Sequence, residues 1–404
     1  MSRLDELIAE FAPEGVTYGA IGDVAECISG GTPTSGVSEF WENGSIPWMS
    51  SGEVSKGTVL GTDKKITQSG FDSCSTKMLP PGAVVMALAG QGKTRGTVAR
   101  TRIALCTNQS LCAIVTDGTV SSDFLYHYLR TQYQQLRNVS SGEGTRGGLN
   151  MQMIRSYRVP IPPLAVQLEI VRILDTFTDL EATLVSELEA RRRQFRFYRD
   201  RLLSNPAGDV RRVPLGELCG IFDGTHQTPR YTNEGVRFVS VENIGAIASS
   251  PKYISSDDFQ ALYKTKPRRG DVFMTRIGTI GTCAVVENDD PLAYYVTLAL
   301  MRPKQDRILS EYLKHAIESS TGIAELRKWT LTSAVPIKIN LGDIGKLLIP
   351  IPSIEEQERI IGLLSDFDSL VNDQSVGLPA EIRTRHQQHV YYRNRILDFE
   401  GSSA

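Results

Sequence analysis

The sequence predicts a mixed α/β (α+β) protein in which two similar globular units alternate with two long helices, an internal pseudo-twofold repeat. First, VPIPPLAVQLEIVRILDTFTDL at 159–180 returns 190 residues later as IPIPSIEEQERIIGLLSDFDSL at 349–370. Second, FYRDRLL at 197–203 returns as YYRNRIL at 391–397. Third, the residues before each of these segments form short apolar runs bounded by Gly, Pro, Ser and Asn, which is typical of strands.

The two globular units also match each other, more weakly than the helices do. The matching pairs are AIGDVAE (20–26) with PLGELCG (214–220), IPWMSSGEV (46–54) with VRFVSVENI (236–244), PPGAVVM (80–86) with RRGDVFM (268–274), and SDFLYHYLR (122–130) with SEYLKHAIE (310–318). We therefore expect globular domains at 1–158 and 206–348, with helical segments at 159–205 and 349–404.

Within the globular units, apolar runs between turn residues predict short strands, and each unit ends in a helix followed by a Gly- or Ser-rich loop. The expected strands are Val84–Leu88, Ala113–Val115, Val236–Val241, Asp271–Thr275 and Leu298–Arg302. The expected helices are Asp123–Arg137 and Glu311–Lys328.

The first long helix is expected from Leu164 to Leu203, about 60 Å at 1.5 Å per residue. Its apolar residues recur every three or four positions, which predicts one stripe of coiled-coil type. They are Leu164, Leu168, Val171, Leu174, Phe177, Leu180, Leu184 and Leu188. We expect Leu174, Phe177, Leu364 and Phe367 to share one buried seam that also supports partner binding.

The second long helix has a start signal and a predicted interruption. Ser353 and Glu356 form a capping-box pattern, while Pro162 and Pro163 precede the first helix where an initial turn tolerates proline. The helix is expected to pause at Gly377-Leu378-Pro379, because proline cannot continue the hydrogen-bond ladder, and to resume from Ile382 to Leu397.

Length and composition narrow the class of protein. The 404 residues suffice for two or three domains, and 41% hydrophobic with 22% charged residues describes a globular chain. No apolar run approaches the 18 or so residues of a membrane span, so we expect no membrane association. Six scattered cysteines without Cys-x-x-Cys pairs argue against zinc and disulfides and fit a reducing cytoplasm.

The net charge of −2 argues against a protein that coats nucleic acid indiscriminately, but it permits local basic patches. The stretch 79–111 contains Lys93, Arg95, Arg100 and Arg102 without an acidic residue. The stretch 264–283 contains Lys264, Lys266, Arg268, Arg269 and Arg276 with Asp271 alone. Either stretch could be a solvated loop or a nucleic-acid contact.

One segment resembles a phosphate-binding loop. ALAGQGKT at 87–94 departs from the nucleotide-binding pattern by one Gly-to-Ala change and follows a predicted strand. Such a loop must open a helix, yet the residues after Thr94 are typical of another strand. The corresponding segment, MTRIGTIGTC at 274–283, keeps glycines and lacks the Lys-Thr pair. We therefore expect a strand–turn–strand without nucleotide binding.

Four sequence features point to one family. They are the repeated P-I-P-[PS]-[LI]-x-x-Q helix entry, the [FY]-Y-R-x-R-x-L helix exit, SGGTP at 29–33 and SSGEGTRGGLN at 140–150. In these features the chain resembles the specificity subunit of type I restriction–modification systems. The resemblance spans essentially the whole chain. It implies that each globular unit is a target-recognition domain for one part of a bipartite, asymmetric DNA site. It also implies that the long helices pack antiparallel as a spacer and dock methyltransferase subunits, two in number, joined by a motor–nuclease restriction subunit.

Side chains suited to base edges or phosphates in the expected loops are the candidate DNA contacts. In the first unit they are Ser50, Ser51, Gln91, Lys93, Thr94, Arg95 and Arg146. In the second unit they are Thr225, His226, Gln227, Arg230, Asn243, Arg276, Thr279 and Lys338. Any one of these could equally be an exposed loop residue without a DNA role.

No catalytic or metal-binding residues are expected in this chain. The double prolines in LPPG (79–82) and IPPL (161–164) lack the flanks of an adenine methyltransferase motif, and no helicase motif set is present. The resemblance implies that S-adenosylmethionine, ATP and Mg²⁺ belong to partner subunits. Two alternatives stay open from the residues, a fragment of an adenine methyltransferase and a coiled-coil scaffold protein.

Overall fold

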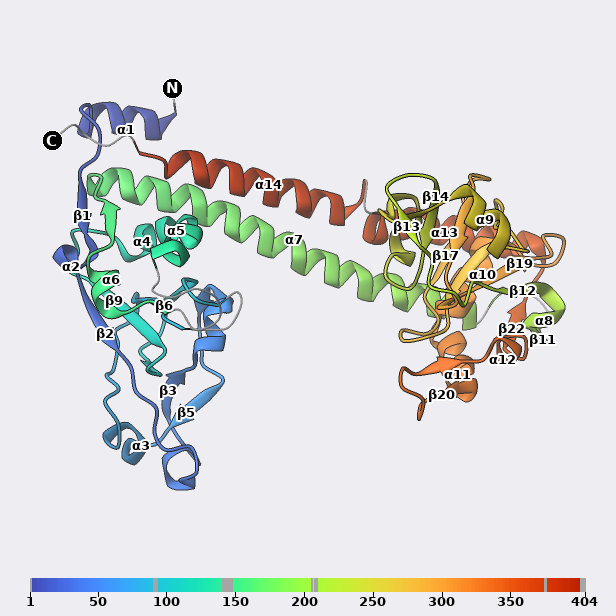
Figure 1. Ribbon diagram of the computed structural model, residues 1–404, viewed down its shortest axis with the longest axis horizontal. Helices are drawn as coiled ribbons and strands as arrows, with labels where there is room; N and C mark the ends of the chain where they lie inside the picture. Colours follow the sequence, from blue (N-terminus) through green and yellow to red (C-terminus); the bar gives the residue numbers. More distant parts are fainter. Residues whose placement is uncertain are drawn as a thin grey trace. The chain divides into compact units, whose positions relative to one another are not determined.

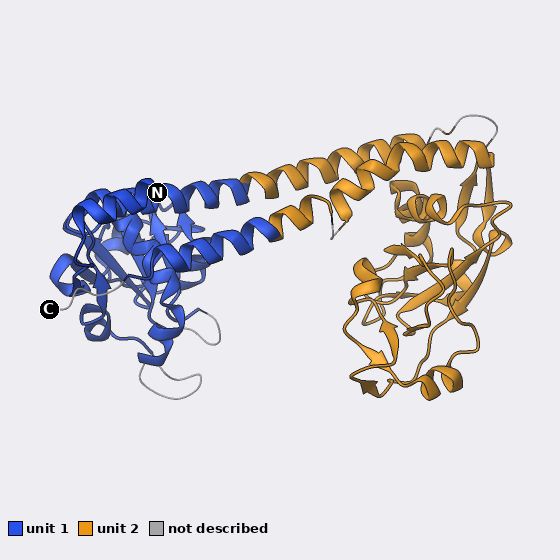
Figure 2. Ribbon diagram, turned by 90° about the horizontal axis from the view of Figure 1, so that it is seen from above, with its two compact units in different colours: residues 1–182, 384–404 blue, residues 183–383 orange. Residues whose placement is uncertain are grey.

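The computed structural model describes residues 2–89, 94–139, 148–204, 206, 210–373 and 376–399. The chain forms two compact units (Figure 2). Unit 1 consists of residues 1–182 and 384–404, and unit 2 of residues 183–383. The helix α7 (Leu164–Ser204) begins in unit 1 and ends in unit 2, so its 41 residues contribute to both.

Unit 1 is built on a five-stranded sheet in the order β2 (Ala25–Ser29), β9 (Leu111–Thr116), β6 (Val84–Ala87), β7 (Val98–Thr101) and β4 (Thr58–Val59). A three-stranded sheet has the order β5 (Lys64–Ile66), β3 (Ile46–Met49) and β8 (Cys106–Thr107), and β1 (Tyr18–Ala20) pairs with β10 (Arg158–Pro160). The helices are α1 (Arg3–Phe11), α2 (Ile21–Val24), α3 (Gln68–Asp72), α4 (Ser122–Thr131), α5 (Tyr133–Val139) and α6 (Met151–Arg155), labelled in Figure 1.

The central strand β6 is buried on both faces, which explains why its residues form a continuous apolar run in the sequence. All four of its residues are buried. Val84 and Met86 belong to the cluster that includes Phe124 of α4, whereas Val85 and Ala87 belong to a separate cluster with Met49. Both faces of the sheet are therefore covered, as the period of two along a strand requires.

Unit 2 contains two four-stranded sheets. Their orders are β12 (Cys219–Asp223), β19 (Leu298–Pro303), β16 (Val272–Thr275), β17 (Cys283–Val285), and β13 (Tyr231–Thr232), β15 (Tyr253–Ile254), β14 (Val236–Val239), β18 (Leu292–Tyr294). The pairs β11 (Arg211–Pro214) with β22 (Leu348–Ile351) and β20 (Thr330–Leu331) with β21 (Lys338–Ile339) complete the strands described. The helices are α8 (Leu215–Leu218), α9 (Ser256–Leu262), α10 (Ser310–Glu318), α11 (Ser320–Trp329), α12 (Leu341–Ile344) and α13 (Ile354–Asn372), followed by α14 (Leu378–Ile396), which ends in unit 1.

The predicted internal repeat is confirmed in strand order. The order β2-β9-β6-β7 corresponds to β12-β19-β16-β17, and β5-β3-β8 corresponds to β15-β14-β18. In both copies the last pair of the second sheet, β3 with β8 and β14 with β18, is parallel, whereas β3 with β5 and β14 with β15 are antiparallel. The five strands predicted from apolar runs all exist, with ends shifted by one or two residues.

The repeated glutamine of the helix entry has the same structural role in both copies. Gln167 Nε2 donates to Pro162 O (2.7 Å) and Thr119 O (3.1 Å), and its Oε1 accepts from Ser121 N (2.7 Å). Gln357 Nε2 donates to Pro352 O (3.1 Å) and Arg307 O (3.0 Å), and its Oε1 accepts from Leu309 N (2.9 Å). Both side chains are fully buried. Each glutamine therefore joins the start of a long helix to the segment that leads into α4 or α10.

The predicted apolar stripe of the first long helix is wrong in its first two turns. Leu164 and Leu168 are 51% and 53% exposed, whereas Val166, Ile170 and Leu174 are fully buried in the unit 1 core. The reason is that this end of α7 carries apolar residues on more than one side, and the globular unit covers the side of Val166 and Ile170. Spacing alone could not show which side is covered.

The expected single seam is also wrong, because its residues belong to two separate cores. Leu174 packs in the core of unit 1 and Leu364 in the core of unit 2. In unit 2, Phe195 of α7 stacks on Phe367 of α13, with ring centroids 6.4 Å apart. In unit 1, Phe177 of α7 stacks on His389 of α14 at 5.7 Å.

The two long helical segments run antiparallel within each unit. In unit 2, Arg192 Nε donates to Val371 O, while Tyr198, further along α7, contacts Phe367, which is earlier in α13. In unit 1, Phe177 contacts Tyr392, and Glu181, one turn later, contacts His389. The direction expected from the family resemblance is therefore confirmed.

Helix interruptions follow local chemistry. The second long helix is interrupted, as predicted, but the break comes earlier than expected. The helix α13 ends at Asn372 and α14 begins at Leu378, so Leu378 and Pro379 belong to the first turn of α14, where proline is tolerated. Ser353 caps α13 by accepting from Glu356 N (3.3 Å). The helices expected at 123–137 and 311–328 are each divided in two, at Gln132 and at Ser319, whose hydroxyl accepts from Gly322 N and caps α11.

Candidate nucleic-acid interface

In unit 2 the loops that follow β12, β14 and β16 lie beside one another. Thr225 forms a β-bridge with Tyr295, and Ile277 forms one with Lys338. Arg276 N donates to Thr297 O (2.9 Å), and Thr297 Oγ1 accepts from Val241 N (3.2 Å). The sequence candidates of this unit therefore gather on loops at one end of the two sheets, although they are far apart in sequence.

Arg276, a candidate DNA contact from the second basic stretch, is buried. Its residue is 7% exposed, and its Nη2 donates to both carboxylate oxygens of Asp223, at 2.9 and 3.0 Å. Its Nη1 also lies 3.4 Å from Ile339 O. Asp223 ends β12, 53 residues earlier in sequence, so the ion pair was invisible in the local pattern.

His226 lies next to this ion pair and faces solvent. Its Nε2 is 2.8 Å from Asp223 Oδ2, and its side chain is 72% exposed. Gln227, Arg230, Thr279 and Lys338 are exposed, as expected of groups that contact DNA, whereas Thr225 is only 7% exposed. Their individual contacts with DNA stay predictions.

Asn243 is held by its own loop. Its Oδ1 accepts from Ser240 N (2.7 Å) and its Nδ2 donates to Ser250 Oγ (2.5 Å), whose hydroxyl bonds Phe238 O. The amide oxygen and the amide nitrogen of Asn243 therefore both stabilise the conformation of the loop after β14. A base contact from Asn243, which would need at least one of these groups, stays a prediction.

In unit 1 the corresponding loops carry different side chains. Gln91, Lys93 and Arg146 lie outside the described residues. Ser50 donates from its backbone N (2.8 Å) and its hydroxyl (3.2 Å) to Glu53 Oε2, which fixes the start of the 3₁₀ turn Ser51–Lys56. Ser51 and Thr94 are half-buried.

Arg95, a candidate DNA contact in the turn between β6 and β7, is buried. The residue is 6% exposed, and its Nε has no hydrogen-bond partner among the residues that the structure describes. The adjacent Gly96 has a positive φ of 80°, and a Cβ added there would meet Leu136 of α5 at 3.4 Å. The turn is therefore packed beneath α5, which explains the burial. The contact of Arg95 with DNA stays a prediction.

Thr32 and Gln109 are two further candidate readers in unit 1 that the basic stretches and loop patterns of the sequence do not indicate. Thr32 Oγ1 bonds Gln109 Oε1 across two loops of unit 1. Gly31 N donates to Thr107 O (2.9 Å), in the place where Thr225 N donates to Tyr294 O (3.2 Å) in unit 2. Thr32 belongs to the SGGTP segment at 29–33, which is the sequence signal for this position.

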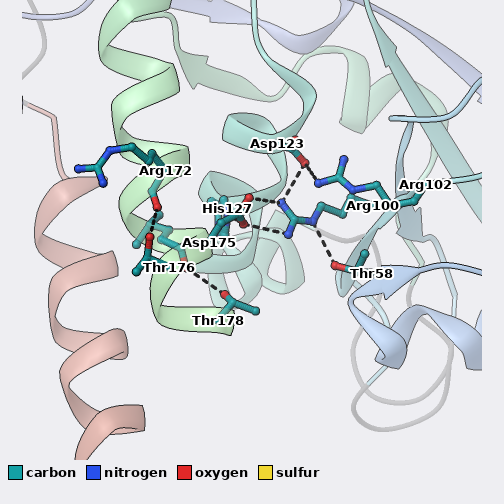
Figure 3. Close-up of polar contacts among 10 residues, drawn as sticks. Thr58, Arg100, Arg102, Asp123, His127, Arg172, Asp175, Thr176 and Thr178 are labelled. Carbon is teal, nitrogen blue, oxygen red and sulfur yellow. Dashed lines mark hydrogen bonds and ion pairs between the residues drawn. The ribbon is translucent and has the colours of Figure 1, made fainter. Parts of the chain in front are cut away.

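Two of the four basic residues between 79 and 111 are internal ion-pair partners (Figure 3). Arg100 of β7 is 7% exposed and lies between Asp123 Oδ1 (2.9 Å) and Asp175 of α7 (2.9 Å from Nη2 to Oδ1), with Thr58 Oγ1 3.1 Å from its Nε. Arg102 Nη2 lies 2.8 Å from Asp123 Oδ1. This stretch therefore offers DNA less positive charge than its composition indicates.

His127 completes the same network. Its Nε2 lies 2.9 Å from Asp175 Oδ1, and the ring is fully buried (Figure 3). Burial would raise the pKa of Asp175, but hydrogen bonds from His127 and Arg100 outweigh this effect and lower it to about 2. Burial lowers the pKa of His127, despite the hydrogen bond to Asp175. The network ties the sheet and α4 to the long helix α7.

The second basic stretch is more open. Lys264, Lys266, Arg268 and Arg269 are exposed on the segment between α9 and β16. In the described part of this region, the carboxylate of Asp271 pairs with Arg302 of β19, with 2.7 Å between Oδ2 and Nη2. The four exposed cations can therefore contribute to phosphate contacts in unit 2.

The strand–turn–strand expected at the phosphate-loop-like segment is confirmed. Val98–Thr101 forms β7 and pairs antiparallel with β6, and β16 pairs with β17 in the same way. Lys93 itself is outside the described residues, and the absence of nucleotide binding stays a prediction. Within the described residues there is no group of three or more His, Cys, Asp or Glu side chains placed to hold a metal ion.

A family model described as the Type I restriction modification DNA specificity domain matches residues 13–190 and again residues 208–384. The chain belongs to this family. It contains two DNA specificity domains joined by long helices and is a specificity subunit, a class that is not itself catalytic.

Curated relatives and solved structures agree. The chain is 31% identical to the EcoR124I/EcoR124II specificity subunit of Escherichia coli, over 70% of this chain and 72% of the relative. It is 29% identical to a putative specificity subunit of Haemophilus influenzae, over 69% and 73%. The S subunit of M. genitalium has the same fold, with a TM-score of 0.58, 14% identity and coverage of 95% and 96%.

No helix in the part of the chain that the structure describes is both long and apolar enough to cross a membrane.

Proposed function

We propose that each specificity domain of this subunit reads one part of a bipartite, asymmetric DNA site. The observation that carries the proposal is the repeat itself. The two domains keep the same strand order and the same buried glutamine contacts, yet their strand-end loops carry different polar side chains. A shared framework with different readers is what recognition of two unlike half-sites requires.

We also propose that the long helices dock methyltransferase subunits, two in number. Leu174 and Leu364, expected to support this contact, are 0% and 1% exposed, so their side chains stabilise the subunit itself. Exposed apolar side chains close to these two leucines are available to a partner. In unit 2, Tyr198 and Leu363 are 46% and 56% exposed and line an apolar hollow of about 310 Å³ with Phe195, Leu202 and Phe367.

Unit 1 supports a second docking position. The sequence repeat places Tyr391 and Tyr392 where unit 2 has Phe197 and Tyr198, and all four residues are 43–60% exposed. An exposed aromatic pair that occurs once in each unit fits two copies of one partner. Exposed aromatic side chains are the groups most enriched at protein interfaces.

The chemistry is proposed to reside on the partners. S-adenosylmethionine would bind the methyltransferase subunits, and ATP with Mg²⁺ would bind a motor–nuclease restriction subunit. All six cysteines are free thiols, and five are buried, which supports a reducing, cytoplasmic location.

Co-expression with a type I methyltransferase subunit from the same genome tests the proposal. We expect the two to co-purify and to methylate one split, asymmetric DNA sequence that is unmodified when this subunit is omitted. Leu363→Asp should abolish co-purification, because it places a charge on the apolar hollow. Ser365→Asp, an exposed position on another side of α13, should not. Unchanged co-purification of the Leu363 variant would contradict docking at this hollow.

A further inference from the structure

In the second specificity domain, we infer that His226 reads a base, that Asp223 sets the tautomer of His226, and that Arg276 is a positioning residue that does not contact DNA. This inference rests on the proposed function. It specifies whether the side chain at one base-contacting position donates or accepts the hydrogen bond. It also separates two residues, His226 and Arg276, that the sequence alone placed together as equivalent candidates.

The two oxygens of Asp223 have different neighbours. Oδ1 accepts from Gly224 N (3.1 Å) and from Arg276 Nη2 (2.9 Å). Oδ2 is the atom that contacts His226 Nε2, at 2.8 Å, and it lies 3.0 Å from Arg276 Nη2. The carboxylate is therefore held from the protein side, with one oxygen directed to the imidazole.

This geometry defines what His226 offers to DNA. A carboxylate only accepts hydrogen bonds, so Nε2 of the neutral ring carries the proton and donates it to Asp223. Nδ1 is then an acceptor on a side chain that is 72% exposed. In the major groove, the bases that present a complementary donor are adenine, through its N6 amino group, and cytosine, through its N4 amino group.

Arg276 is excluded as a direct reader by its contacts. Its side chain is 8% exposed, and its guanidinium donates to Asp223 and lies against Ile339 O. Its backbone is fixed as well, because Arg276 N donates to Thr297 O and Ile339 N donates to Arg276 O (2.9 Å). Arg276 therefore holds Asp223 in place from within the domain.

The first domain shows that this arrangement is not needed for the fold. Leu149 N donates to Leu88 O (2.9 Å) there, in the same way as Ile339 N donates to Arg276 O, so Leu88 corresponds to Arg276. Ser29 ends β2 where Asp223 ends β12, and Thr32 corresponds to His226. The backbone contacts persist while the ion pair and the imidazole are replaced, as expected of positions that determine different specificities.

Asp223→Asn tests the inference, because the tautomer should invert. The amide oxygen should take the Oδ1 position, where Gly224 N and Arg276 both donate, and the amide NH₂ should then face His226. Nε2 becomes the acceptor and Nδ1 becomes a donor. The variant should lose preference for adenine or cytosine at one position and gain preference for guanine or thymine, which present acceptors there.

The measurement is selection of bound duplexes from a pool randomised across the site, with the complete complex of subunit and methyltransferase. We expect Asp223→Asn to exchange the preferred base at one position of the second half-site. His226→Ala should reduce the preference there about tenfold, without a new preference. Arg276→Met should weaken the same preference and leave the salt dependence of binding unchanged, because no phosphate contact is lost. Asp257→Asn, an exposed carboxylate on α9, is the matched control and should behave as the wild type.

The outcomes separate this inference from the proposed function. A wild-type complex without any sequence preference would contradict the proposed function. A wild-type preference that persists unchanged in both His226→Ala and Asp223→Asn would overturn the inference alone. A uniform loss of affinity in Asp223→Asn, without a change of preferred base, would overturn the role of the tautomer. Circular dichroism of each variant shows whether the domain is still folded.

Discussion

At the residue scale, the buried histidines of α4 and α10 are structural groups. His127 and His315 occupy corresponding positions, and both are buried. Burial lowers the pKa of His315 to about 4, and the positive charge of Lys314 contributes. Phe195 of α7 packs against the ring, and Asp368 of α13 and Arg199 of α7 are the other nearby charges. The folded chain therefore favours neutral His315.

This property predicts a loss of stability in mild acid. The usual histidine pKa is 6.5, so the unfolded chain binds a proton at His315 as the pH falls below that value, while the folded chain does not until near pH 4. Stability is thus complete above pH 6.5 and declines below it. Between pH 7 and pH 5 the wild type should lose about 2 kcal/mol of unfolding free energy through this residue. In urea unfolding at both pH values, His315→Leu should lose correspondingly less, and an equal loss in both proteins would contradict the assignment.

At the element scale, Arg100 and Asp175 connect the sheet of unit 1 to the long helix. β7 supplies Arg100, α4 supplies Asp123 and His127, and α7 supplies Asp175. Because Arg100 is almost fully buried, its charge needs both carboxylates. The network fixes where α7 lies against the globular part of this unit.

Removing one carboxylate should therefore be costly. Asp175→Ala leaves Arg100 buried with Asp123 alone among the carboxylates of this network, and should lower the unfolding free energy by about 3 kcal/mol. Glu187→Ala is the control on the same helix. Its carboxylate is 45% exposed and pairs with Arg191 on the surface, so its loss should cost about 0–1 kcal/mol. Urea unfolding compares the two, and equal costs would show that the buried network does not stabilise unit 1.

The elements were largely predictable, and the partners of single side chains were not. Apolar runs and the repeated helix entry identify the strands and long helices, because burial and periodicity act over neighbouring residues. Arg100 reaches Asp175 across 75 residues, and Arg276 reaches Asp223 across 53. In the sequence both arginines belong to basic stretches that could be solvated loops or nucleic-acid contacts, because the carboxylates that neutralise them come from other elements. The same limitation applies to α7, where packing selected Val166 and Ile170 over Leu164 and Leu168.

At the scale of the whole molecule, one framework is used twice with different loops. The matched strand orders and the paired contacts of Gln167 and Gln357 show that the framework is retained in each unit. The loops at the ends of β2 and β12 differ at four corresponding positions, where Ser29, Gly31, Thr32 and Pro33 of the first unit stand in place of Asp223, Thr225, His226 and Gln227 of the second. The central claim is therefore that each domain determines one half of the recognised sequence independently of the other.

Replacement of one domain tests this claim most directly. Residues 20–150 would be exchanged for the corresponding segment of a relative with a known, different site, and the methylated sequence would be mapped after co-expression with the methyltransferase. We expect one half of the methylated sequence to change to that of the relative and the other half to stay the same, because residues 210–340 are untouched. A change in both halves, or in neither, with the complex still assembled and active, would contradict the account.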